Sequence, residues 1–169
     1  MVKEMVTKYH RDIDAALVEV GKSSKFVKKV FRGNENPIPI ADFSTKKVVN
    51  YKPDVYFLLK NRFKLIFQVL ESEIKKQDTL IADVVRACLV ENCIGLIFIH
   101  PSEDEKDKER ILESLYIVIK GLNHKGIPID ELPEKSSSYF VDRYAAENKQ
   151  LVVKVLKQAL EEEKWFKKS

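Results

Sequence analysis

The 169-residue sequence predicts an α/β fold, a single three-layer domain in which a central mixed β-sheet is flanked by helices. Three observations predict it. Apolar residues recur at helical spacing over residues 2–20. Two strand-like runs, 54–59 and 63–70, are separated by a short polar turn, which indicates an antiparallel hairpin. An almost wholly apolar run at 94–99 follows a helical segment, which is typical of a parallel strand buried on both faces.

The N-terminal half supplies the first helix and the hairpin. The helix over residues 2–20 has a plausible stop at Gly21 and is followed by a basic segment, 26–32. Residues 33–39 are a loop by composition. The run 46–49 is a weak strand, placed at an edge of the sheet.

The C-terminal half supplies the remaining helices. The spacing of apolar residues predicts a helix over about 75–91, before the buried strand, and another over 102–120. Residues 121–133 are rich in loop-forming residues. A last helix is expected over about 140–166, where it packs on the domain or forms a homodimer contact. All of residues 1–169 are thus assigned to one domain.

Composition narrows the cellular setting and the partners. The 30 basic and 26 acidic side chains leave a net charge of +4, an excess that permits a polyanionic partner without demanding one. No apolar run approaches the roughly 18 residues that a membrane span needs, so no membrane partner is expected. The charged N-terminus is unlike a signal peptide, which predicts an intracellular, cytoplasmic protein.

Three acidic residues of the hairpin form the candidate site. Side chains alternate across a strand, so Glu71 and Glu73 continue the face that carries Leu65, Phe67 and Val69. Asp54 opens the partner strand, and the start of one hairpin strand lies beside the end of the other. Carboxylates at the end of an apolar row need neutralisation, and a divalent cation such as Mg²⁺ supplies it. The alternative is a helix cap, with Ser72 as the N-cap residue and acidic groups favoured by the helix dipole.

This pattern resembles the PD-(D/E)xK nuclease superfamily, which has the restriction-endonuclease-like fold. The resemblance rests on Pro53-Asp54, on a strand ending in Glu71-Ser72-Glu73, and on the helix and apolar strand that follow. It implies that Asp54 and Glu71 bind Mg²⁺ (or Mn²⁺). The family usually has lysine where this chain has Glu73, so Glu73 is assigned as a further ligand or as a base. Lys75 or Lys76 would then supply the missing positive charge.

The resemblance also implies a metal-binding acid on the first helix. Glu19 is the candidate there, with Asp12 and Asp14 as competitors on a more exposed face. The sequence contains three histidines, His10, His100 and His124, and no two of them stand at ligand spacing.

The resemblance therefore implies a metal-dependent nuclease that hydrolyses phosphodiester bonds of DNA, with a homodimer as a further expectation. A basic run with interleaved aromatic residues adds a candidate nucleic-acid surface. The resemblance adds Gln77 to it. The alternative is a non-catalytic nucleic-acid-binding or assembly module on a degenerate nuclease scaffold. The residues assigned to nucleic-acid binding are Lys25, Lys28, Lys29, Arg32, Lys47 and Gln77.

Overall fold

The computed structural model describes residues 7–41, 48–71, 73–101, 104–107, 109–111, 113–114, 140–145 and 149–161. The helical elements bounded within these residues are α1 (Lys8–Ser23), the 3₁₀ turn η1 (Glu73–Lys75), α2 (Gln77–Leu89) and α5 (Lys149–Glu161). The strands are β1 (Val27–Arg32), β2 (Ile38–Ala41), β3 (Val48–Tyr51), β4 (Val55–Leu59), β5 (Lys64–Val69), β6 (Cys93–His100) and β7 (Phe140–Ala145).

The central sheet has five strands in the order β1-β4-β5-β6-β7. Strands β1, β4 and β5 pair antiparallel, whereas β5, β6 and β7 pair parallel, so the sheet is mixed. Every residue of β6 is buried, as expected for a central strand covered on both faces. The predicted hairpin and the predicted parallel strand are therefore confirmed.

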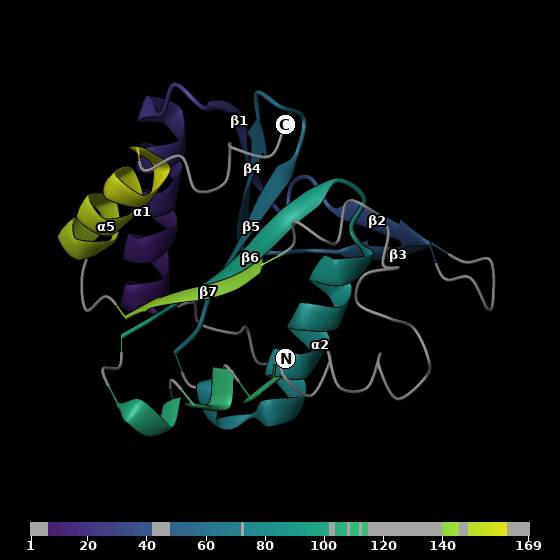
Figure 1. Cartoon of the computed structure of the whole chain (residues 1–169), viewed down its shortest axis with the longest axis vertical. Coiled ribbons are helices and arrows are strands. Elements are labelled where there is room, and N and C mark those ends of the chain that lie inside the picture. Colours follow the sequence, from purple (N-terminus) through teal and green to yellow (C-terminus); the bar gives the residue numbers. More distant parts are fainter. Residues whose placement is uncertain are drawn as a thin grey trace.

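Helices cover both faces of this sheet. Helices α1 and α5 lie together on one face and α2 lies on the other, as Figure 1 shows. The first face buries Phe57 and Phe67 against Leu17 of α1, together with Val152 and Leu156 of α5. The other face packs β4–β6 against α2, with the β2–β3 hairpin on the same side. The predicted α/β class, a mixed sheet between helices, is confirmed.

Helix α1 runs past the predicted stop. Gly21 lies inside the helix and is buried, and a Cβ there would stand 2.4 Å from Cγ2 of Val30 and 2.7 Å from the Phe57 ring. The glycine therefore permits a close approach of the helix to the sheet instead of ending the helix. Residues 2–6, where the predicted helix begins, lie outside the described residues.

Two segments of the N-terminal half differ from prediction. The basic segment 26–32 contains an edge strand of the central sheet, β1, which pairs with β4. The weak strand at 46–49 corresponds to β3, which pairs with β2 in a separate two-stranded sheet. Strand β2 begins inside the loop predicted over 33–39; Ile38 and Ile40 are buried while Pro39 is exposed, as in a half-buried edge strand.

The expected helix over 140–166 is wrong at its start. Residues Phe140–Ala145 form strand β7, parallel to β6, and the helix α5 begins at Lys149. The spacing of apolar residues after residue 149 is helical. Residues 140–145, however, pair with a strand more than 40 positions earlier in the chain, and the local spacing of apolar residues does not reveal such a distant pairing. Residues 162–166, the end of the predicted helix, lie outside the described residues.

The remaining segments agree with prediction as far as they are described. The helix predicted over 75–91 appears as η1 and α2, and residues 105–107, 109–111 and 113–114 are helical, as expected for 102–120. The loop predicted at 121–133 lies outside the described residues. Within the ranges given above, no helix combines the length and apolar character needed to cross a membrane.

Candidate metal centre

Asp54 occupies the end of the sheet where β4 begins and β5 ends. The antiparallel register pairs Val55 with Phe67, so Asp54 stands beside the last residues of β5. Its Oδ2 accepts a hydrogen bond from the backbone N–H of Val69 at 2.8 Å. Its own N–H points to Oε1 of Gln68 at 3.4 Å, and the Gln68 amide in turn donates to the buried Tyr51 hydroxyl at 2.9 Å. The expectation that the hairpin brings Asp54 to the end of β5 is confirmed.

Gly33 allows this part of the chain to come close to the end of β1. A Cβ on Gly33 would stand 1.9 Å from the carbonyl oxygen of Pro53 and 2.6 Å from its nitrogen. Because both atoms belong to the backbone, no side-chain movement would relieve the overlap. Gly33 therefore helps to set the position of Pro53 and of Asp54 after it.

Helix α1 places two further side chains beside Asp54. His10 and Asp14 are four residues apart and so lie on the same face of the helix. His10 Nε2 is 3.0 Å from Oδ1 of Asp54 and 3.6 Å from Oδ1 of Asp14. One ligand atom from each of the three residues lies within 4.8 Å of the other two. All three side chains are partly buried, with exposed fractions of 24%, 16% and 24% for His10, Asp14 and Asp54.

Ionisation of the Asp14 carboxyl group is unfavourable in this arrangement. The pKa of Asp14 is raised from 3.8 to about 6, chiefly by burial and also by the nearby charge of Asp54. His10 and Arg32 act in the opposite direction. Oδ1 of Asp14 is buried and has no hydrogen-bond partner. An unsatisfied buried carboxylate oxygen is costly unless a cation neutralises it.

Arg32 ends strand β1 next to this group. Its Nη1 is 4.0 Å from Oδ2 of Asp14, and 45% of its side chain is exposed. An exposed ion pair at that distance adds little stability. The guanidinium is therefore available to an anion that reaches the group from solvent.

Glu71 lies next to the cluster but outside the group of three. It is exposed, and the hydroxyl of Thr7 donates a hydrogen bond to its Oε2. Oγ1 of Thr7 also caps α1 by accepting from the backbone N–H of His10 at 3.1 Å. Burial, with Glu71 as a second cause, raises the pKa of Tyr9. Glu71 thus holds the first turn of α1, which carries His10.

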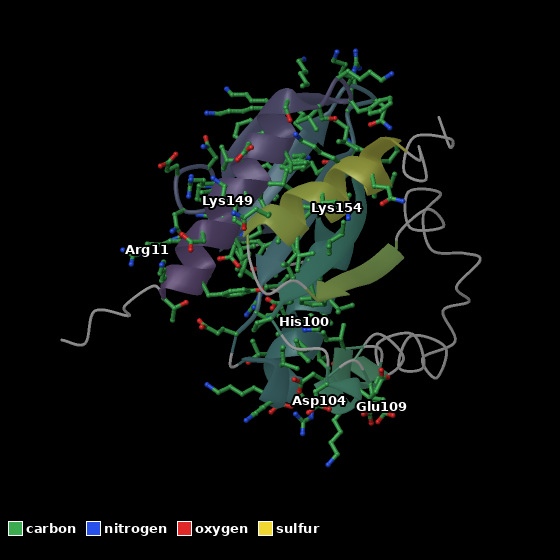
Figure 2. The ribbon with its side chains drawn as sticks, turned by 90° about the vertical axis from the view of Figure 1, so that its left-hand side faces the viewer. Arg11, His100, Asp104, Glu109, Lys149 and Lys154 are labelled. Atoms are coloured by element: carbon green, nitrogen blue, oxygen red, sulfur yellow. The ribbon has the colours of Figure 1, made fainter. Side chains whose placement is uncertain are left out.

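The other predicted metal-site residues do not belong to this group, or their side chains lie outside the described residues. Glu73 belongs to η1, but its side chain lies outside the described residues, while Lys75 and Lys76 are exposed. The carboxylate of Glu19 is 3.3 Å from Nζ of Lys149 at the start of α5, a residue labelled in Figure 2. The structure therefore places Asp14, one of the competitors considered for α1, beside Asp54 in the position expected of Glu19.

The predicted nucleic-acid residues divide between an edge strand and a helix contact. Lys25, Lys28 and Lys29 are exposed, and the ammonium groups of Lys25 and Lys29 lie 5.1 and 5.0 Å from the ring centroids of Phe26 and Phe31. Lys47 lies outside the described residues. The amide of Gln77 instead donates to the carbonyl of Arg110 at 3.0 Å and to the hydroxyl of Ser114.

His10 is the residue that sequence reasoning missed. No two histidines of the sequence stand at ligand spacing. A histidine and an aspartate four residues apart on one helix face, however, form a ligand pair of another kind. The interpretation that Asp14 lies on a more exposed face was wrong, because Asp14 faces the start of β4 and is mostly buried.

The spacing of the three ligand atoms fits a small divalent cation. Two ligands in adjacent positions about 2.1 Å from one ion are about 3.0 Å apart in octahedral geometry and about 3.4 Å apart in tetrahedral geometry. The distance from His10 Nε2 to Asp54, 3.0 Å, equals the octahedral value, and the distance to Asp14, 3.6 Å, is slightly longer than the tetrahedral value. Oδ1 of Asp14, which has no hydrogen-bond partner, is a ligand atom that such an ion would use.

Comparisons of the chain with protein-family models, with curated proteins and with solved structures found no match.

Proposed function

We propose that this protein is a metal-dependent nuclease that hydrolyses phosphodiester bonds of DNA. The observation that carries the proposal is the convergence of His10, Asp14 and Asp54 from a helix and a strand, with Arg32 at its edge. Phosphodiester hydrolysis mainly requires a positioned water and positive charge on the phosphate, and a site of this composition supplies both.

Each residue has a distinct role in this proposal. His10, Asp14 and Asp54 hold the cation, which when bound polarises a phosphate oxygen and acidifies a water. The backbone N–H of Val69 fixes the orientation of Asp54 by binding the other carboxylate oxygen. Arg32 binds the phosphate from solvent, because its exposed guanidinium is only weakly engaged by Asp14. Thr7 and Glu71 hold the first turn of α1 in place.

Cleavage of DNA by a chelator-treated and metal-reloaded preparation tests the proposal. Asp54→Asn keeps the shape of the side chain and removes its charge, so we expect at least a hundredfold loss of metal-dependent cleavage. Asp12→Asn is the matched control, since Asp12 is exposed on α1 and outside the group. Equal cleavage by wild type and Asp54→Asn, both stripped of contaminating nuclease, would overturn the proposal.

A second candidate function is a non-catalytic nucleic-acid-binding module. It is favoured by the exposed Lys25, Lys28 and Lys29 on or next to the edge strand β1, because lysines there bind a phosphate backbone without a metal. Edge strands also carry lysine simply to prevent pairing with other chains. Duplex DNA binding that is unchanged by chelator and by Asp54→Asn, with no cleavage, would establish this second function instead.

A further inference from the structure

The group of three contains a nitrogen ligand at its centre. His10 Nε2 is the atom that lies within 3.0 Å of Asp54 Oδ1 and 3.6 Å of Asp14 Oδ1, so any ion held by both carboxylates also meets the imidazole. The helix turn that carries the ring is held by a chain of two hydrogen bonds. The backbone N–H of His10 donates to the N-cap Thr7, and the Thr7 hydroxyl donates to Glu71.

This donor set discriminates between classes of metal. Mg²⁺ is a hard cation that takes oxygen ligands and keeps most of its water. Imidazole nitrogen suits Zn²⁺, Co²⁺ and related transition-metal ions. Three protein ligands that leave a further position open are also the arrangement of catalytic zinc sites.

We propose that the His10–Asp14–Asp54 group selects a transition-metal ion of the Zn²⁺ class over Mg²⁺. The inference rests on the metal site of the proposed function and replaces the Mg²⁺ that the sequence resemblance implies. The affinity order is Zn²⁺ and Co²⁺ above Mn²⁺, with Mg²⁺ weakest.

The proposed metal also bears on the role of the residue at position 73. The resemblance leads to the expectation of a lysine there, and this chain has glutamate. Among the described residues whose contacts place them at the group, Arg32 supplies the positive charge, and it is 4.0 Å from Asp14. A transition-metal ion is a stronger Lewis acid than Mg²⁺, so the reaction depends less on a neighbouring lysine.

Metal binding to the full chain tests the inference without any measure of activity. Zn²⁺, Co²⁺ and Mg²⁺ are titrated separately into chelator-treated protein, Zn²⁺ and Co²⁺ in competition with a chromophoric chelator and Mg²⁺ by calorimetry. Co²⁺ is also followed by its visible absorption, which reports its ligands. The informative variant is His10→Asp, which turns the group into an all-oxygen site while leaving both other carboxylates in place. Asp12→Asn changes an exposed residue of α1 outside the group and serves as the control.

The expected results concern the ratio of Zn²⁺ to Mg²⁺ affinity. Wild type and Asp12→Asn should bind Zn²⁺ at least a hundredfold more tightly than Mg²⁺. His10→Asp should lower that ratio at least tenfold and alter the Co²⁺ spectrum, with circular dichroism confirming that it is folded. Equal affinities in wild type, or the same ratio in His10→Asp, would overturn the inference. If the protein selects Zn²⁺ but does not cleave DNA, the inference about the metal holds and the proposed nuclease function is wrong.

Discussion

At the scale of single residues, Asp14 combines a stability cost with a proposed role in metal binding. Its pKa is raised from 3.8 to about 6, so the folded protein holds the Asp14 proton more tightly than the unfolded chain does. Such a group adds stability below pH 4, and that stability is lost as the pH rises through 6. At pH 8 the charged carboxylate is retained although its neutral form is favoured by burial.

Replacing Asp14 with asparagine should therefore stabilise the metal-free protein at alkaline pH. A shift of about two pKa units corresponds to at most about 3 kcal/mol, so we expect Asp14→Asn to raise the melting temperature by about 3–8 °C at pH 8. The gain should shrink as the pH falls toward 4. Thermal melts in chelator at several pH values measure it. A lower melting temperature for Asp14→Asn at pH 8, with Asp12→Asn unchanged, would contradict the assigned cause.

At the scale of elements, the first turn of α1 is held by a hydrogen-bond chain from Glu71 through Thr7 to His10. The sequence predicted Glu71 as a metal ligand, whereas the group of three does not include it. It gave no means of knowing that Glu71 contacts a helix cap 64 residues earlier in the chain, because that contact depends on how α1 docks.

Thr7→Val should weaken both the helix and the metal site. It keeps the shape of the side chain and removes the cap, which costs about 1 kcal/mol of unfolding free energy, and it releases the His10 backbone. We expect a severalfold loss of Zn²⁺ affinity in calorimetry, whereas Thr7→Ser, which keeps the hydroxyl, should stay within twofold of wild type. Equal losses for Val and Ser would show that the hydroxyl has no part in the effect.

The turn after β1 positions the start of β4. Gly33→Ala would bring a methyl group onto the Pro53 backbone, so the chain must shift next to Asp54. We expect a loss of about 1–3 kcal/mol of stability and at least a tenfold loss of metal affinity at temperatures where the protein stays folded. Asn34→Ala, in the same exposed turn, is the control. Unchanged metal affinity in folded Gly33→Ala would mean that Asp54 is not positioned in this way.

At the scale of the whole molecule, the fold was more predictable than the site. Turn residues and apolar runs indicated β4, β5 and β6 because each of these strands is marked locally by its own composition. Strand β7 was missed because its identity depends on pairing with β6 across a long stretch of chain. For a related reason His10 was missed and Glu19 was preferred to Asp14, since the meeting of His10 and Asp14 with Asp54 depends on the docking of α1, which Gly21 permits.

The exposed lysines of β1 should contribute to DNA binding through charge alone. A register shift between Val27 and Lys29 accompanies the exposure of both Lys28 and Lys29. Replacing each lysine by glutamine should reduce the slope of log affinity against log salt by about one unit, with similar effects on all DNA sequences. Fluorescence anisotropy at several salt concentrations measures the slope. A slope that does not change would place the DNA elsewhere on the molecule.

The central claim is that His10, Asp14 and Asp54 share one divalent cation. Anomalous diffraction from crystals soaked in Zn²⁺ or Mn²⁺, recorded at the absorption edge of each metal, tests it most directly. We predict one anomalous peak per chain, about 2.0–2.3 Å from His10 Nε2 and from an oxygen of each aspartate. A peak bound instead by Glu71 and Glu73, or no peak beside His10 at saturating metal, would contradict the account.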